Sequence, residues 1–120
     1  VVLSVPRKYY LVQQGMNWND AQAYCKAKHT DLAIVESDDN MVHLQYETQR
    51  QKFTSSAWIG MYNDVNSWRW SMGNVPLGSF TAWYKGLPDI KGVKKACGVR
   101  GNYGWFDVIC TQTLPFFCFD

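Results

Sequence analysis

The chain has 120 residues, of which 47% are hydrophobic and 16% aromatic, enough apolar side chain for one buried core and too much for a disordered sequence. Twelve Lys and Arg against ten Asp and Glu give a net charge of +2, which excludes the strongly basic balance of a general nucleic-acid binder. No apolar run approaches the roughly 18 residues of a membrane span. We therefore expect a single domain over residues 1–120 that has no nucleic-acid partner and does not insert into a membrane.

The chain opens with the pattern of a strand followed by a helix. Tyr9–Val12 is rich in aromatic and β-branched residues, which are typical of a strand. Asn17 is a suitable N-cap, and apolar residues recur after it at helical spacing, so an amphipathic helix is predicted over Asn17–His29. The residues at that spacing are Trp18, Ala21 and Cys25.

A second strand and helix follow. Ala33–Val35 is short and fully apolar, which predicts a buried strand. Ser37 is the predicted cap of a second helix, with Asp38 and Asp39 in its first turn, where acids favour the helix dipole. This helix is expected to end near Gln51–Lys52.

The second half has the pattern of strands around one long loop. The run from Ser71 to Ala96 is rich in Gly and Pro and has little periodicity, and a loop of this length in a small domain usually binds something. Helices first and strands later indicate an α+β fold. The strand tryptophans Trp58, Trp68 and Trp70, and the loop-side Trp83 and Trp105, are expected in the core. Strands are predicted at Ala57–Met61, Trp68–Trp70, Ala96–Val99, Trp105–Val108 and Phe116–Phe119.

Four cysteines, an even number, indicate two disulfides and an oxidising compartment, with reduced core thiols as the alternative. They allow three pairings, and the residues alone leave the pairing open. No C-x-x-C motif occurs, which argues against a thioredoxin-like redox centre and a zinc ribbon. The four residues are Cys25, Cys97, Cys110 and Cys118.

Taken together, these residues and their spacing resemble the C-type lectin-like domain over essentially the whole chain. The resemblance implies an α+β fold in which two helices flank two small antiparallel sheets and a long loop region. It also implies the pairs Cys25–Cys118 and Cys97–Cys110, and the short form of the domain. The matching residues are Trp18-x-x-Ala21-x-x-x-Cys25, Leu32-Ala33, Trp58-Ile59-Gly60-Met61, Trp68-x-Trp70, Trp83, Gly86-x-Pro88, Cys97, Gly104-Trp105-x-Asp107, Cys110 and Phe117-Cys118.

The sugar-binding members of this family hold Ca²⁺ with a Glu/Gln-Pro-Asn/Asp triplet, a later Glu and a Trp-Asn-Asp stretch. Here the triplet is Leu87-Pro88-Asp89, the later position falls at Lys94–Lys95, and the last stretch is Trp105-Phe106-Asp107. Ca²⁺ takes about 6–8 oxygen ligands, whereas only Asp89 and Asp107 remain at these degenerate calcium positions. We expect no metal and no cofactor. Because Pro88-Asp89 resembles the galactose-type triplet, a calcium-dependent galactose-type lectin stays the alternative.

The segment from Lys85 to Arg100 has five basic residues and one acid, Asp89. A basic loop beside aromatic residues favours an anionic partner, either an acidic protein face or a sulfated or sialylated glycan. The alternative is a solvated loop whose lysines only maintain solubility. The predicted ligand-binding residues are Asp89, Lys91, Lys94, Lys95 and Arg100.

No catalytic motif such as Gly-x-Ser-x-Gly or His-Glu-x-x-His occurs, and His29 and His43 lie in the predicted helices. The sequence therefore predicts a binding module and not an enzyme. Its expected location is extracellular, either secreted or as the ectodomain of a receptor. Self-assembly into a homo-oligomer is left open.

Overall fold

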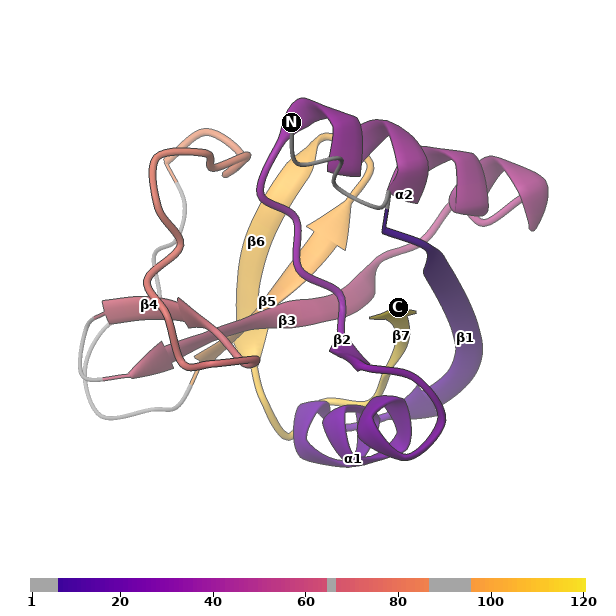
Figure 1. Cartoon of the computed structure of the whole chain (residues 1–120), viewed down its shortest axis with the longest axis horizontal. Coiled ribbons are helices and arrows are strands. Elements are labelled where there is room, and N and C mark those ends of the chain that lie inside the picture. The colour runs from indigo at the N-terminus through magenta and orange to yellow at the C-terminus, as the bar shows by residue number, and fades with distance from the viewer. Residues whose placement is uncertain (1–6, 65–66, 87–95) are drawn as a thin grey trace, which may run out of the picture.

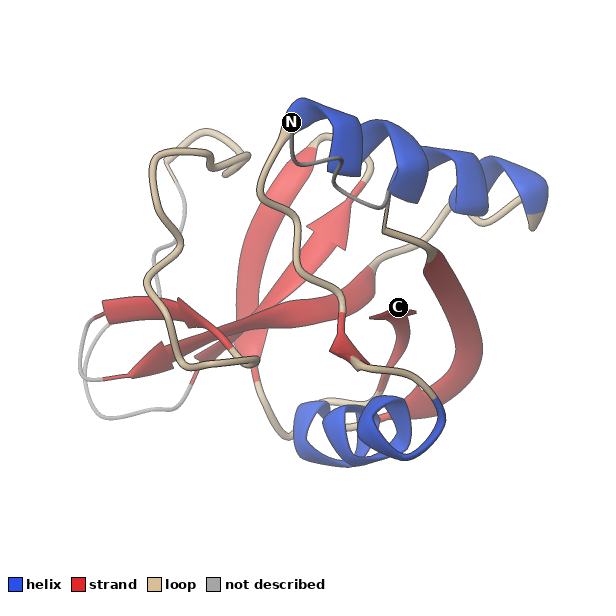
Figure 2. Cartoon of the chain, viewed as in Figure 1, coloured by secondary structure: helices blue, strands red, loops and turns tan. Residues whose placement is uncertain are grey.

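The computed structural model describes residues 7–64, 67–86 and 96–120 of the chain. Two helices lie on opposite sides of the strand region in the view of Figure 1, and Figure 2 distinguishes helices, strands and loops. Within the described residues, neither helix is long and apolar enough to cross a membrane. The elements are β1 (Tyr9–Met16), α1 (Trp18–Lys28), β2 (Asp31–Leu32), α2 (Asp38–Arg50), β3 (Ala57–Asp64), β4 (Ser67–Trp70), β5 (Ala96–Gly101), β6 (Gly104–Ile109) and β7 (Leu114–Phe119).

Both helices begin at the predicted caps. The Asn17 side chain accepts a hydrogen bond of 2.8 Å from the Asp20 backbone N–H at the start of α1. The Ser37 hydroxyl accepts one of 3.1 Å from the Asn40 N–H at the start of α2. These bonds satisfy backbone donors that the first turn of a helix leaves without partners. The predicted ends of both helices are confirmed to within a residue or two.

The strands are joined in the order β1-β7-β3-β5-β6, with β2 paired to β7 and β4 paired to β3. All of these pairs are antiparallel except β3 with β7, which meet in parallel at Trp58 and Phe116. This one contact joins the two small antiparallel sheets that the resemblance implies into a single network of the described strands. The strands predicted at 9–12, 57–61, 68–70, 96–99, 105–108 and 116–119 are confirmed, and each is longer than expected at one end or both.

The strand expected at Ala33–Val35 is wrong as secondary structure, although its burial is confirmed. The strand is Asp31–Leu32, just before it. Ala33 N–H donates to Phe117 C=O at 2.9 Å, and Gly60 N–H donates to Ala33 C=O at 2.8 Å. Single hydrogen bonds thus hold the run between β7 and β3. Its residues are apolar because they are buried, although they form no ladder of paired hydrogen bonds with either strand.

The core contains most of the tryptophans. Trp58, Trp70 and Trp105 are fully buried, whereas Trp68 and Trp83 are only partly buried against the core. Trp18 and Trp58 each donate the indole N–H to a backbone carbonyl, of Ile59 at 3.0 Å and Met16 at 2.9 Å. These bonds remove the cost of burying the polar end of a large aromatic side chain.

Two disulfides close the fold with the pairing that the resemblance implies. Cys25 of α1 is bonded to Cys118 of β7, and Cys97 of β5 is bonded to Cys110, which follows β6. The first joins residues 93 positions apart and the second joins residues 13 positions apart. The first therefore ties a helix near the start of the chain to the last strand.

Candidate functional site

The site lies at the end of the hairpin that β5 and β6 form. The hairpin closes at the pair Gly101 and Gly104, which leaves Asn102 and Tyr103 as its turn. The Asn102 side-chain amide donates a 2.8 Å hydrogen bond to the Thr54 carbonyl. This bond fixes the turn against the segment that leads into β3.

Gly104 lets a second segment pack against the hairpin. A Cβ at this position would lie 2.9 Å from both the Ala82 carbonyl oxygen and the Tyr84 nitrogen, and the residue has φ of +145°. Tyr84 N–H donates to Trp105 C=O at 2.9 Å, and Trp105 N–H donates to Ala82 C=O at 2.7 Å. A residue with a side chain at position 104 would push this segment away, so the glycine places Tyr84 beside the hairpin.

Aromatic contacts also hold the segment that contains Ala82 and Tyr84 against the hairpin. Trp105 packs edge-on against Trp83, with ring centroids 5.9 Å apart, and against Trp70 at 5.8 Å and Phe80 at 6.1 Å. Trp83 also contacts Trp68 at 4.9 Å. Edge-to-face pairs of this kind are each worth about 0.5–1.5 kcal/mol beyond the area that they bury. Tyr84 therefore follows directly on an anchored residue.

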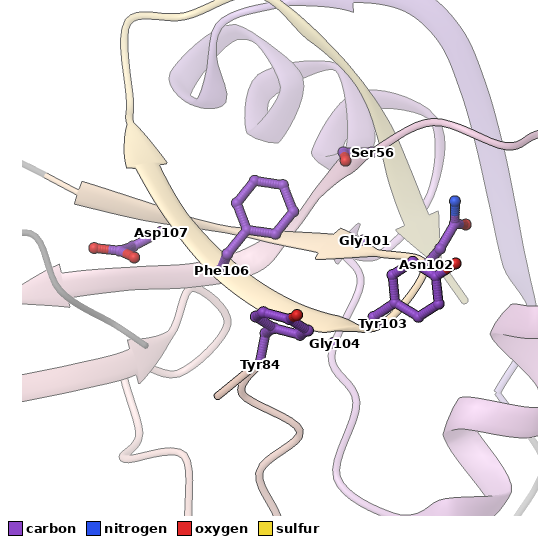
Figure 3. A pocket seen from close by; sticks show the side chains of 8 residues that line it. All are labelled: Ser56, Tyr84, Gly101, Asn102, Tyr103, Gly104, Phe106 and Asp107. Atoms are coloured by element: carbon purple, nitrogen blue, oxygen red, sulfur yellow. The ribbon is translucent and has the colours of Figure 1, made fainter. Parts of the chain in front are cut away.

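These contacts shape a hollow of about 380 Å³ on the surface. Tyr103 is 87% exposed and Tyr84 is 51% exposed at its edge. Phe106 lies against Gly101, where a Cβ would come within 2.7 Å of its ring. Figure 3 shows the three aromatic rings around the end of the hairpin, with Asp107 farther along β6. The lining residues are Ser56, Tyr84, Gly101, Asn102, Tyr103, Gly104, Phe106 and Asp107.

The hollow has the chemistry of a binding site. Exposed aromatic faces bind the apolar face of another ring or aliphatic group, while the hydroxyl, amide and carboxyl groups can orient polar atoms of the same ligand. Lys85, next to Tyr84, is also exposed and adds a cation beside the hollow. Rigid tyrosines contribute contact area at a small entropic cost, since each has only two side-chain torsions.

Four of the predicted site residues, Asp89, Lys91, Lys94 and Lys95, lie outside the described residues. Their role stays a prediction. The structure does describe Lys85 and Gly86, which follow Tyr84 of the hollow and lead directly into that segment. The basic segment thus begins next to the aromatic rings.

The structure removes Arg100 from the predicted basic surface. Arg100 lies in β5 with 4% of its surface exposed, and its guanidinium donates to the side-chain oxygen of Gln45 on α2. Burial lowers the pKa of Arg100. Successive residues of a strand face opposite sides of the sheet. Gly101 lines the hollow, so the side chain of Arg100 lies on the opposite face. It is a buried contact to α2 and does not lie on the exposed loop.

The residues present do not fit a calcium ion. Asp107 is buried, and the neighbouring Phe106 offers a ring where the family's calcium motif has an amide oxygen. In the parts of the chain that the structure describes, no three His, Cys, Asp or Glu side chains come together as a metal site. The other motif positions, Leu87 and Lys94–Lys95, lie outside the described residues, and none of these three side chains carries an oxygen ligand of the kind that Ca²⁺ takes.

Sequence reasoning missed most of the hollow, including its exposed residues Tyr84, Tyr103 and Asn102. One signal could have identified two of them. Gly101 and Gly104 frame two residues between two apolar strands, a pattern that indicates a short hairpin with an exposed turn. Nothing local indicates Tyr84, because it reaches the hairpin through a contact more than 20 positions along the chain.

Comparison with known proteins gives one family. Residues 14–119 match the family model described as "Lectin C-type domain". The hepatic lectin of Gallus gallus is 31% identical over 115 residues, which cover 93% of this chain and 54% of the chicken protein. The CD209 antigen-like protein C of Mus musculus is 31% identical over 113 residues, covering 92% of this chain and 61% of the mouse protein. The chain therefore spans little more than half the length of these two relatives.

Solved structures show the same fold. Human lithostathine superposes with a TM-score of 0.83 at 21% identity, covering 98% of this chain and 85% of that one. At this identity the likeness concerns the fold alone.

Proposed function

The chain belongs to the lectin C-type domain family, and from this premise we propose that it is a calcium-independent recognition module for a protein or an anionic glycan. The binding surface consists of the hollow at the β5–β6 hairpin and the basic segment that begins at Lys85. Recognition without catalysis agrees with relatives that are named as lectins and antigens.

The observation that carries the proposal is the hollow itself. Its rings of Tyr84 and Tyr103 are exposed, Tyr84 is followed in the chain by Lys85, and the sequence continues from there to Lys91, Lys94 and Lys95. Aromatic faces supply contact area, and the lysines attract a negative charge over a longer range. A ligand that combines a ring or aliphatic face with carboxylate or sulfate groups fits both parts.

The calcium motif argues for independence from the metal. Leu87 and Phe106 bring hydrocarbon, and Lys94–Lys95 bring positive charge, to positions where the family's calcium sites have oxygen. A nearby ammonium group opposes binding of a cation. The calcium-dependent galactose-type lectin remains the second candidate on one observation, the Pro88-Asp89 pair.

The two disulfides support an extracellular location. Both pairs, Cys25–Cys118 and Cys97–Cys110, need an oxidising compartment to form and persist. We propose that the module is secreted or is the ectodomain of a receptor.

Retention on immobilised heparin, with EDTA and with millimolar CaCl₂, tests the proposal. We expect retention in both buffers, and we expect the Lys94→Ala/Lys95→Ala variant to elute at lower salt. The matched control is Lys26→Ala/Lys28→Ala, which removes the same charge from α1 and should elute close to the wild type. Equal elution of the loop variant and the control would reject the basic segment as the attractive element. Retention on a galactose column that EDTA abolishes would establish the second candidate instead.

An array of glycans and proteins then tests the hollow. Tyr103→Ser removes a ring that is 87% exposed, so the fold should be unaffected while binding to the array's retained ligands falls. Unchanged binding by Tyr103→Ser and Tyr84→Ser together would place the ligand elsewhere.

A further inference from the structure

Helix α2 presents an apolar stripe to solvent. Val42 is 57% exposed and Tyr46 is 69% exposed, whereas Leu44 and Thr48 on the other side of the helix are buried. Residues four positions apart are neighbours on a helix surface, so the two exposed side chains form one patch. Large apolar side chains that gather on a helix face, away from the core, indicate a contact surface.

Charges of opposite sign flank this patch along the helix. Asp38 and Asp39 lie in the first turn and Arg50 lies in the last turn. Asp39 and Arg50 are 11 positions apart, which corresponds to about 16 Å along the axis and to nearly the same direction around it. Asp39, Val42, Tyr46 and Arg50 therefore follow each other in one stripe.

This stripe is complementary to itself when a second copy runs antiparallel. The midpoint of Val42 and Tyr46 is position 44, and the midpoint of Asp39 and Arg50 lies between positions 44 and 45. A two-fold axis through that point places each Asp39 opposite the second copy's Arg50 and each Val42 opposite its Tyr46. An isologous interface requires this kind of self-complementary patch.

A groove beside α2 extends the match. It has a volume of about 300 Å³ and runs between the start of β1 and the C-terminal half of the helix. Among the described residues its exposed Lys8 has no ion pair. Arg50 already contacts Glu47 at 2.8 Å, but 68% of its side chain is exposed and it has further N–H donors. The lining residues are Arg7, Lys8, Tyr9, Tyr10, His43, Tyr46, Glu47 and Arg50.

The groove thus carries cations at the end of the helix over which the second copy's acidic first turn would lie. We infer that α2 is a homodimer interface, in which two copies pair their α2 helices antiparallel with Asp38 and Asp39 of each facing Lys8 and Arg50 of the other. The apolar contact of Val42 with Tyr46 lies at its centre, and the charge pairs set its direction. The groove and the ligand hollow share no lining residue, so this inference does not depend on the proposed function.

Analytical ultracentrifugation of charge-reversal variants tests the interface. Asp39→Lys and Arg50→Glu each place like charges at both ends of the dimer, and we expect each to weaken self-association about tenfold or more. An equimolar mixture of the two variants places Lys opposite Glu at one end and Arg opposite Asp at the other. The mixture should therefore form a heterodimer with nearly wild-type affinity.

Lys26→Glu on α1, a charge reversal away from the stripe, is the control and should dimerise like the wild type. Since Arg50→Glu also brings a second carboxylate next to Glu47, circular dichroism checks its fold. Tyr46→Ser gives a variant that does not involve Arg50, and it should also weaken the dimer. A wild-type chain that stays monomeric at about 0.1–1 mM, the millimolar end of the affinity scale, overturns the inference. Dimers that survive Tyr46→Ser, or a mixture that does not reassociate, overturn it as well.

Discussion

Two regions of the molecule, one around β1 and β7 and the other around the hollow, are held in place by different kinds of contact. Around β1 and β7, an antiparallel ladder with one irregularity, a disulfide and a 3.0 Å side-chain contact between His29 and Asp120 hold the last strand against the first part of the chain. Around the hollow, residues 71–86 are positioned by two backbone hydrogen bonds to Trp105, by isolated bridges and by aromatic contacts. In the first region, many bonds together hold the strands in place. In the second region, the position of a binding residue depends on a few specific contacts.

Removing the disulfides one at a time is the strongest test of this difference. In the chain-entropy model, the Cys25–Cys118 bond, which closes 93 positions, stabilises by about 4.7 kcal/mol, and the 13-position Cys97–Cys110 bond by about 3 kcal/mol. We expect the double Ser variant of the first pair to lose more free energy of unfolding in urea than that of the second. Both variants replace two cysteines, so each is the control for the other.

An equal loss, or a larger loss for Cys97 and Cys110, would contradict the comparison. It would show that the β5–β6 hairpin depends on the Cys97–Cys110 bond more than the region around β1 and β7 depends on the Cys25–Cys118 bond.

Gly104→Ala tests the region around the hollow, with Gly78→Ala as its control. Both glycines have positive φ, +145° and +83°, but a Cβ at Gly104 would lie 2.9 Å from the Ala82 oxygen whereas a Cβ at Gly78 meets nothing within 4 Å. We expect Gly78→Ala to cost about 1 kcal/mol, from backbone strain alone. Gly104→Ala should cost about 3 kcal/mol, because overpacking adds to the strain.

Near-ultraviolet circular dichroism distinguishes a moved segment from general destabilisation. The Trp83–Trp105 contact should be altered in Gly104→Ala and kept in Gly78→Ala. If the two spectra are alike, the packing of Tyr84 does not depend on Gly104.

The difference between the region around β1 and β7 and the region around the hollow also explains which features the sequence could predict. The helices, their caps and the strands follow from local patterns, such as Asn17 before residues at helical spacing and Ser37 before two acids. The prediction of a strand at Ala33–Val35 is wrong, because burial between β7 and β3 leaves the same apolar composition as a ladder does. Periodicity detects burial, and hydrogen bonding has to be known from the neighbours.

The site was less predictable than the fold. Arg100 belongs to a basic segment by sequence, but the alternation of β5 turns it towards Gln45 on α2. Tyr84 carries no local signal, because its place at the hollow comes from bonds to Trp105. Residues in irregular segments are placed by distant contacts, and a single sequence contains little trace of those.

A smaller effect is expected from the Glu47 carboxylate, which joins α2 to β1. The buried Glu47 carboxylate accepts hydrogen bonds from the Leu11 N–H at 2.9 Å, from Arg50 at 2.8 Å and 3.1 Å, and from Gln51 at 2.9 Å. An amide has only one acceptor oxygen and would turn its own N–H groups towards these donors. We expect Glu47→Gln to lower the free energy of unfolding at neutral pH by about 2 kcal/mol. Asp64→Asn, at an exposed carboxyl at the end of β3, should change it by less than about 0.5 kcal/mol.

The pH dependence shows whether the charge of Glu47 is responsible. Burial raises the pKa of Glu47, but the hydrogen bonds from Arg50, Leu11 and Gln51 outweigh burial, so the folded-state pKa lies below the ordinary value of 4.5. A carboxyl group whose pKa is lowered by folding stabilises the protein above its unfolded pKa, and this contribution is lost as the pH falls through the folded value. The gap between the wild type and Glu47→Gln should therefore be constant near neutral pH and narrow below about pH 4.5, as urea unfolding at each pH would measure. A gap that keeps its width down to pH 3 would mean that Glu47 joins α2 to β1 by its shape and not by its charge.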